Sequence, residues 1–300
     1  MKFLKGLALV ILGFLLSLSL IVFGFTLTVN QTALNPGFVA SQADSLDIPS
    51  LAEEVLSEQV PQEHDYLTEF VVEAVNDTIV EQELWIKQQA KDGIYAFYDY
   101  LERRSQHLSL AISIESIKES LRENLREAVL ASPPPELEGL SPALIEQEFN
   151  QFWSEYSEEV PSTLELDESL LEPEVMEQFE RAREIVGYIH LTYKALIALS
   201  LLLILLIVLI YREVRGSTRQ IGITFLTCGI ASYVGALITK NIAGTQLTQL
   251  DMPVYLQTWI PQLIKDVLSP LEIYGIGLMV AGAALLVVSF VYKRRDEYSY

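Results

Sequence analysis

The chain has 300 residues, of which 50% are hydrophobic, and its 40 acidic residues give a formal net charge of −20. A single soluble domain rarely combines so much apolar sequence with so many carboxylates, so we expect the two to be segregated. Residues 30–190 hold 34 acidic and 9 basic residues, whereas the rest of the chain is apolar with basic clusters. The acidic segment repels nucleic acid, which excludes that class of partner. The single cysteine, Cys228, excludes a disulfide within the chain.

Four apolar runs are long enough to cross a bilayer, which takes roughly 20 residues of helix. They predict membrane spans at residues 7–29, 191–211, 221–239 and 273–292, and the third is the least hydrophobic. We interpret residues 1–29 as a cytoplasmic N-terminus followed by an uncleaved signal anchor. The apolar stretch exceeds the usual signal-peptide core and no A-x-A motif follows it, but a cleaved signal peptide is the alternative.

Basic residues flank these spans in three clusters. The clusters are Lys2 and Lys5, then Arg212, Arg215 and Arg219, and finally Lys293, Arg294 and Arg295. Four crossings place all three on one side, and basic residues in short loops are retained in the cytoplasm. We therefore expect a multi-pass protein of the cytoplasmic membrane with both termini inside, including the loop 212–220 and the tail 293–300. Residues 30–190 and the loop 240–272 are then outside.

The acidic segment predicts a bundle of about five helices. Ser50 and Glu53 have the spacing of a capping box, and helical periodicity extends over residues 64–104 with a break or kink at Gly93. The segment "HLSLAISIES" alternates as a strand does, but it has no evident partner strand. We interpret it as an extended connector to a helix over residues 115–130.

Two prolines predict the starts of the last two helices of the acidic segment. Ser141 and Pro142 are a good N-cap and first residue for a helix that ends near Ser157. Pro173 opens a run without a breaker before the second span, which predicts one continuous helix entering the membrane. In the loop 240–272 an amphipathic stretch predicts a short surface helix, with Ser269 as the N-cap of the fourth span.

The expected fold class is therefore all-α: a four-helix transmembrane bundle with a large extracytoplasmic helical domain inserted between its first and second spans. Two details of its packing are testable. Lys194 and Glu272 lie near the outer span ends and could form an ion pair, with snorkelling as the alternative. Small residues at four-residue spacing predict close helix approach, either within the bundle or in a homo-oligomer. They are Ala231 and Gly235 on the third span, and Gly277 and Ala281 on the fourth.

Chemistry-bearing motifs are missing from the sequence. The three histidines, His64, His107 and His190, are far apart, and no zinc, phosphate-loop or nucleophile motif is present. Ion or proton transport normally requires ionisable residues inside spans, and the span interiors contain none. We therefore expect no catalytic, metal-binding or cofactor-binding residue and no cofactor, although an enzyme built from distant residues is an alternative.

Two stretches, "LNPGFVASQADSLDIPSL" and "YDYLERRSQHLSLAISIESIKESL", are similar to segments of uncharacterised prokaryotic four-pass membrane proteins with a large extracytoplasmic helical domain. The resemblance implies a layout and no functional residue. We expect a non-enzymatic membrane protein whose acidic helical domain binds a partner protein, an envelope component or a ligand. A sensor or accessory subunit working through a separate partner is one alternative, and an oligomeric channel or transport subunit is another.

Overall fold

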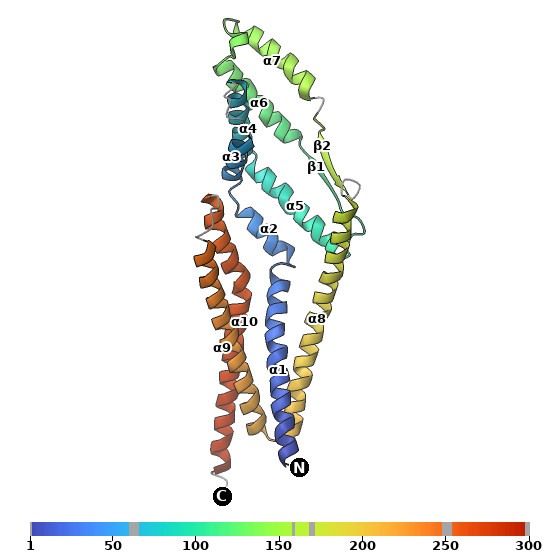
Figure 1. Ribbon diagram of the computed structural model, residues 1–300, viewed down its shortest axis with the longest axis vertical. Helices are drawn as coiled ribbons and strands as arrows, with labels where there is room; N and C mark the ends of the chain where they lie inside the picture. Colours follow the sequence, from blue (N-terminus) through green and yellow to red (C-terminus); the bar gives the residue numbers. More distant parts are fainter. Residues whose placement is uncertain (1, 60–65, 158–159, 168–171, 248–253, 298–300) are drawn as a thin grey trace. The chain divides into compact units, whose positions relative to one another are not determined.

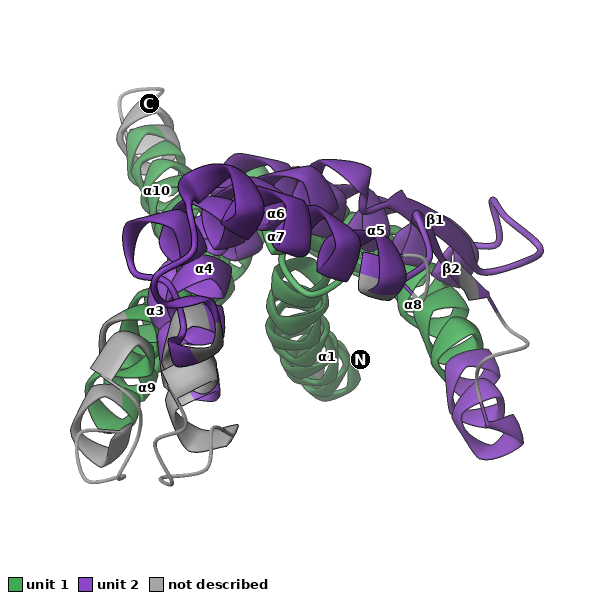
Figure 2. Cartoon of the chain, turned by 90° about the horizontal axis from the view of Figure 1, so that it is seen from above, with its two compact units in different colours: residues 1–39, 182–300 green, residues 40–181 purple. Residues whose placement is uncertain are grey.

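The computed structural model describes residues 2–59, 66–157, 160–167, 172–247 and 254–297 (Figure 1). The chain divides into two compact units, coloured separately in Figure 2. We call residues 1–39 with 182–300 the apolar unit, and residues 40–181 the acidic unit.

Within the described ranges, four helices are long and apolar enough to cross a membrane. They are α1 (Lys2–Gln31), α8 (Pro173–Tyr211), α9 (Val214–Leu247) and α10 (Val254–Glu297). The four predicted spans are confirmed to this extent, and α9 has the lowest mean hydropathy, 1.9. The continuous helix from Pro173 is also confirmed, because α8 extends over 39 residues to Tyr211. At 1.5 Å per residue it is about 58 Å long.

The connections between spans are shorter than predicted. Only Arg212 and Glu213 separate α8 from α9, so Arg215 and Arg219 lie on the first turns of α9 instead of in a loop. Arg212 has a φ of 57°, the left-handed conformation that commonly ends a helix. This conformation lets the chain reverse direction within two residues. A nine-residue loop over 212–220 could reverse direction without it.

The predicted loop 240–272 is mostly helix. The helix α9 continues to Leu247, α10 begins at Val254, and the fourth span therefore has no N-cap at Ser269. Pro261 and Pro270 both lie inside α10. Each proline removes one main-chain hydrogen bond and normally disfavours a continuous helix. The helix α10 nevertheless continues through both, because it packs along α9 over much of its length.

The acidic unit is largely helical, as predicted. Its elements are α3 (Ile48–Gln59), α4 (Tyr66–Glu81), α5 (Glu83–Leu101), α6 (Glu115–Ala131), a 3-10 turn η1 (Pro135–Leu137) and α7 (Pro142–Ser157). The helix α2 (Pro36–Asp44) leads into it and the first turns of α8 lead out. The expected break at Gly93 is wrong, since the helix is interrupted at Gln82. A Cβ at Gly93 would lie 3.1 Å from Cδ2 of Leu110, so this glycine makes room for a packed side chain.

The segment "HLSLAISIES" contains a strand, so its interpretation as a connector is wrong. Strand β1 (Ser109–Ser113) pairs antiparallel with β2 (Thr163–Asp167), with Ser109 opposite Asp167 and Ser113 opposite Thr163. The two form a two-stranded sheet beside the helices. The alternation Thr-Leu-Glu-Leu-Asp was the available signal for the missing partner.

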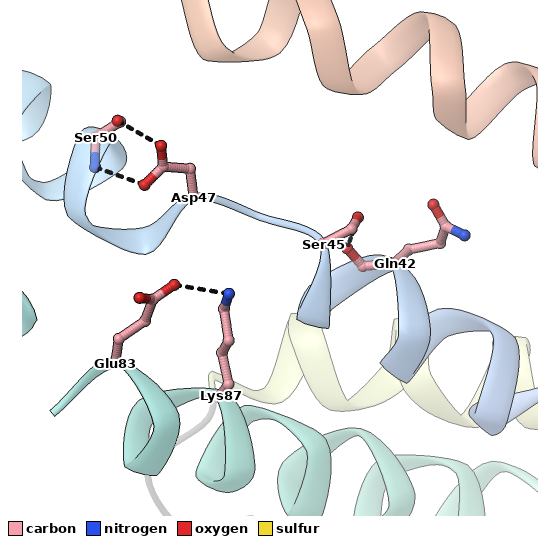
Figure 3. Close-up of polar contacts among 6 residues, drawn as sticks. All are labelled: Gln42, Ser45, Asp47, Ser50, Glu83 and Lys87. Carbon is pink, nitrogen blue, oxygen red and sulfur yellow. Dashed lines mark hydrogen bonds and ion pairs between the residues drawn. The ribbon is translucent and has the colours of Figure 1, made fainter.

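The helix α3 begins one turn earlier than predicted. Asp47 accepts hydrogen bonds from the Ser50 amide at 3.2 Å and from the Ser50 hydroxyl at 2.7 Å (Figure 3). Asp47 is therefore the residue that caps α3, in place of Ser50 with Glu53. Figure 3 also shows a second local contact, the ion pair of Glu83 with Lys87 at 2.7 Å on the first turns of α5.

Candidate functional site

Basic residues gather at one end of the apolar unit. The Lys5 ammonium lies 5.9 Å from the ring centroid of Tyr211, and the Ser289 hydroxyl donates a hydrogen bond to the Arg215 carbonyl at 3.1 Å. These contacts join the start of α1, the α8–α9 turn and the last turns of α10, which Figure 1 shows at the same end. The three basic clusters therefore share one end. The side chains of Lys2, Lys293, Arg294 and Arg295 are outside the described part of the chain.

An ion pair between α9 and α10 replaces the one that we predicted. Glu272 pairs with Lys240 at 2.8 Å, and both side chains are about four-fifths buried. Among the described residues, Lys194 on α8 is exposed and forms no ion pair, so its predicted pairing with Glu272 is wrong. The reason is that α9 and α10 pack along each other, which brings Lys240 and Glu272 onto facing turns. Sequence position alone does not show which of two lysines, Lys194 or Lys240, pairs with Glu272, because both lie near span ends on the same side.

Close approach of α9 and α10 uses glycines other than those predicted. Gly235 and Gly277 have no heavy atom within 4 Å of an added Cβ, and Ala231 is exposed. The helices instead meet at Gly222 and Gly229 of α9, which face Gly282 and Gly275 of α10. A Cβ at Gly229 would lie 2.6 Å from the Gly275 carbonyl oxygen, and one at Gly282 would lie 2.7 Å from the Leu226 nitrogen. Ala281 of α10, also predicted, is half-buried.

The seven-residue spacing of these glycines explains why the small residues predicted to form the contact are not the ones that form it. Gly222 and Gly229 are seven residues apart, as are Gly275 and Gly282. A seven-residue repeat keeps one stripe of a helix on its neighbour when two helices coil around each other with a left-handed twist. The predicted four-residue spacing is instead typical of right-handed crossings.

Side chains from α9 and α10 hold α1 through its main-chain carbonyls. Gln220 donates to the Leu9 carbonyl at 2.6 Å, and the Tyr274 hydroxyl donates to the Leu20 carbonyl at 2.8 Å. Each carbonyl lies four residues before a glycine of α1, Gly13 or Gly24. A Cβ at either glycine would come within 2.8 Å of the incoming side chain. With Leu16 of α1 fully buried, α1 is an integral part of this unit's core.

The acidic unit is braced by α5. Lys91 pairs with Asp44 at 2.9 Å, which joins α5 to α2, and this hydrogen bond raises the pKa of Lys91. At the other end of α5, the Tyr100 hydroxyl donates to Glu180 of α8 at 2.9 Å. A single helix therefore contacts the segments through which the chain enters and leaves the unit.

Basic side chains of α6 are directed to one flank of α7. Arg126 pairs with Glu146 at 3.4 Å, and Arg122 donates to Asn150 at 2.8 Å. Lys118 donates to the carbonyl of Ser157, the last residue of α7, at 2.9 Å. These three residues recur every four positions, so they form one stripe on α6. All three side chains contact the same flank of α7, and one of these contacts is an ion pair with a carboxylate, Glu146.

The described residues do not assemble a metal site. Among them, no group of three or more His, Cys, Asp or Glu side chains is placed to hold a metal ion. His64 lies outside the described residues. A hydroxyl–carboxylate contact joins Ser120 to Glu81 at 2.5 Å, and Asn124 donates to the neighbouring Thr78 at 3.0 Å. We interpret this cluster as a tie between α4 and α6.

A shallow groove lies between α1 and α8 in the apolar unit. Its volume is about 270 Å³, and it is lined mainly by apolar side chains with two threonines and a tyrosine.

No family model matches the chain, and no curated protein or solved structure matches it either. The resemblance to four-pass prokaryotic membrane proteins therefore stays a prediction.

Proposed function

We propose that this chain is a non-enzymatic integral protein of the cytoplasmic membrane, and that its acidic unit stands outside the cell to bind a partner. A partner protein, an envelope component or a small ligand could be bound there. The apolar unit is the membrane mount.

The observation that carries this proposal is the convergence of the basic clusters at one end of the apolar unit. The Lys5–Tyr211 and Ser289–Arg215 contacts support it. Because basic residues in short loops stay in the cytoplasm, this end faces inward. The acidic segment is inserted between α1 and α8, whose other ends then emerge outside. The repulsion of anionic headgroups by its carboxylates favours a water-facing acidic unit.

The brace formed by α5 supports a binding role over a purely connecting one. Its contacts with Asp44 and Glu180 join the entry and exit segments of the acidic unit to one helix. A surface held in this way loses little conformational entropy when a partner binds.

A sensor that works through a separate partner is a second candidate. The uninterrupted helix α8 favours it, because one rigid element joins the acidic unit to a membrane span. Such a sensor would need a cytoplasmic or membrane partner that contacts the basic turn. Substitution of Arg215 and Arg219 by glutamine would then abolish its output without changing its topology. No contact within the described ranges favours an oligomeric channel or transport subunit.

Photo-crosslinking in intact cells tests the proposal. A photoreactive amino acid would replace Leu84, whose side chain is 84% exposed in the acidic unit, or Val280, which is 65% exposed on a spanning helix. The proposal predicts a discrete adduct from position 84 that recurs at other exposed positions of the acidic unit. Adducts from position 280 alone would contradict a binding role for the acidic unit.

A further inference from the structure

We propose that the exposed face of α7 is the docking surface of the acidic unit, and that it binds a cationic amphipathic helix of a partner protein. The exposed face of α7 comprises Leu144, Gln147, Glu148, Gln151, Phe152 and Glu155, all of which are exposed. This inference rests on the proposed function, because it names the surface and the class of partner.

The exposed face combines apolar anchors with carboxylates. Leu144 and Phe152 are 48% and 51% exposed, and they lie two turns apart along the helix. Glu148 lies between them, and Glu155 extends the same face by another turn. Aromatic residues on helix surfaces are frequent anchors of protein interfaces, and a surrounding polar rim supplies specificity.

Charge on this face is negative and unneutralised. The helix α7 contains no lysine or arginine. The nearest basic stripe, on α6, is committed to the other flank through Arg126–Glu146, Arg122–Asn150 and the carbonyl contacts of Lys118. Within the described ranges, no ion pair reaches Glu148 or Glu155. A partner that supplies lysine or arginine beside an apolar stripe matches both properties of the face.

A second copy of the chain is a poor occupant of this face. Two identical faces meeting around a twofold axis would bring four carboxylates together without a compensating cation, which is repulsive. The face therefore selects a different, basic sequence. At 1.5 Å per residue, Leu144 and Phe152 are about 12 Å apart along the axis, so a partner helix of two to three turns covers them.

The test uses the full chain in phosphatidylcholine nanodiscs and a fluorescent 14-residue Lys/Leu peptide of amphipathic helical pattern. A peptide of the same composition without that pattern is the first control, and empty nanodiscs give the background from lipid binding. We expect Phe152→Ala to weaken peptide binding at least tenfold. We expect Glu148→Gln with Glu155→Gln to weaken it about fivefold and to reduce its salt dependence.

The matched control variant is Leu164→Ala with Glu165→Gln on β2. Leu164 is 42% exposed and Glu165 is also exposed, so this variant removes a similar apolar area and one charge elsewhere on the acidic unit. The inference predicts unchanged affinity for it. Equal weakening by this variant, or equal binding of the unpatterned peptide, would overturn the inference in favour of unspecific charge attraction.

A photoreactive residue in place of Phe152 or Leu164, used in cells, distinguishes failure of the α7 surface from failure of the proposed function. Capture from position 152 and not from position 164, with the crosslink on a basic amphipathic helix of the partner, supports both the surface and the function. Capture from position 164 alone overturns the α7 surface and leaves the proposed function standing. Capture from neither position, with none from Leu84, contradicts the proposed function itself.

Discussion

The Tyr100 hydroxyl donates a hydrogen bond to Oε1 of Glu180 at 2.9 Å. Tyr100 is the largest fully buried side chain among the described residues. Beside it, the rings of Phe97 and Phe179 pack edge to face at 5.4 Å. These contacts fasten the end of α5 to the start of α8, a helix long and apolar enough to cross a membrane. The first turns of α8 are therefore held within the acidic unit by packing as well as by the chain.

Substitution Tyr100→Phe tests this attachment. It keeps the ring and removes the donor to a carboxylate, so we expect a loss of about 1 kcal/mol in the local stability of α5. Amide hydrogen exchange of α5 in the full chain measures the change. Tyr95→Phe is the matched control, because Tyr95 lies on the same helix and is 43% exposed. Equal acceleration of exchange in both variants would show that the Tyr100 hydrogen bond has no special role.

The α9–α10 contact predicts opposite results for two glycines on one helix. Gly229→Ala places a methyl group 2.6 Å from the Gly275 carbonyl oxygen, so we expect overpacking to cost about 2 kcal/mol or more. Gly235→Ala meets no atom within 4 Å and should be neutral or slightly stabilising. Thermal unfolding in detergent compares the two variants. A similar midpoint for both would contradict the observed packing face.

The core position of α1 predicts a contrast between two leucines. Leu16 is fully buried, whereas Leu18 is 50% exposed on the same helix. In a bilayer Leu16→Ala leaves a cavity without a compensating exposure to water, so we expect a loss of about 2 kcal/mol. Leu18→Ala should change stability little. If both variants keep the wild-type unfolding midpoint, α1 does not contribute to the core as described.

The cap of α3 predicts a dependence on acid. Hydrogen bonds from Ser50, aided by Lys87, lower the pKa of Asp47 below its ordinary value of 3.8. A lowered pKa in the folded state means that the cap stabilises α3 above pH 3.8 and loses this effect as pH falls through the lower folded value. Hydrogen exchange of the Ser50 amide should therefore accelerate selectively in acid. Asp47→Asn caps without ionising, and its exchange should lack this transition.

Local signals located most of the helices but not all of their ends, and they were insufficient for the contacts between helices. Hydrophobic runs located all four spanning helices, and the absence of a breaker after Pro173 predicted α8. The partner of β1, by contrast, lies far along the chain, and the choice of Lys240 over Lys194 depends on which helices pack together. The contacting face of α9 was missed because two spacings of small residues coexist there, and only the structure distinguishes Gly229 from Gly235.

The orientation of the chain is the claim on which the proposed function depends most directly. Single cysteines at Leu84 and at Arg215, in a Cys228→Ala background, can be labelled in intact cells with a thiol reagent that does not cross membranes. We predict labelling of Leu84→Cys in intact cells and of Arg215→Cys only after permeabilisation. Labelling of Arg215→Cys in intact cells, with Leu84→Cys protected, would contradict the account.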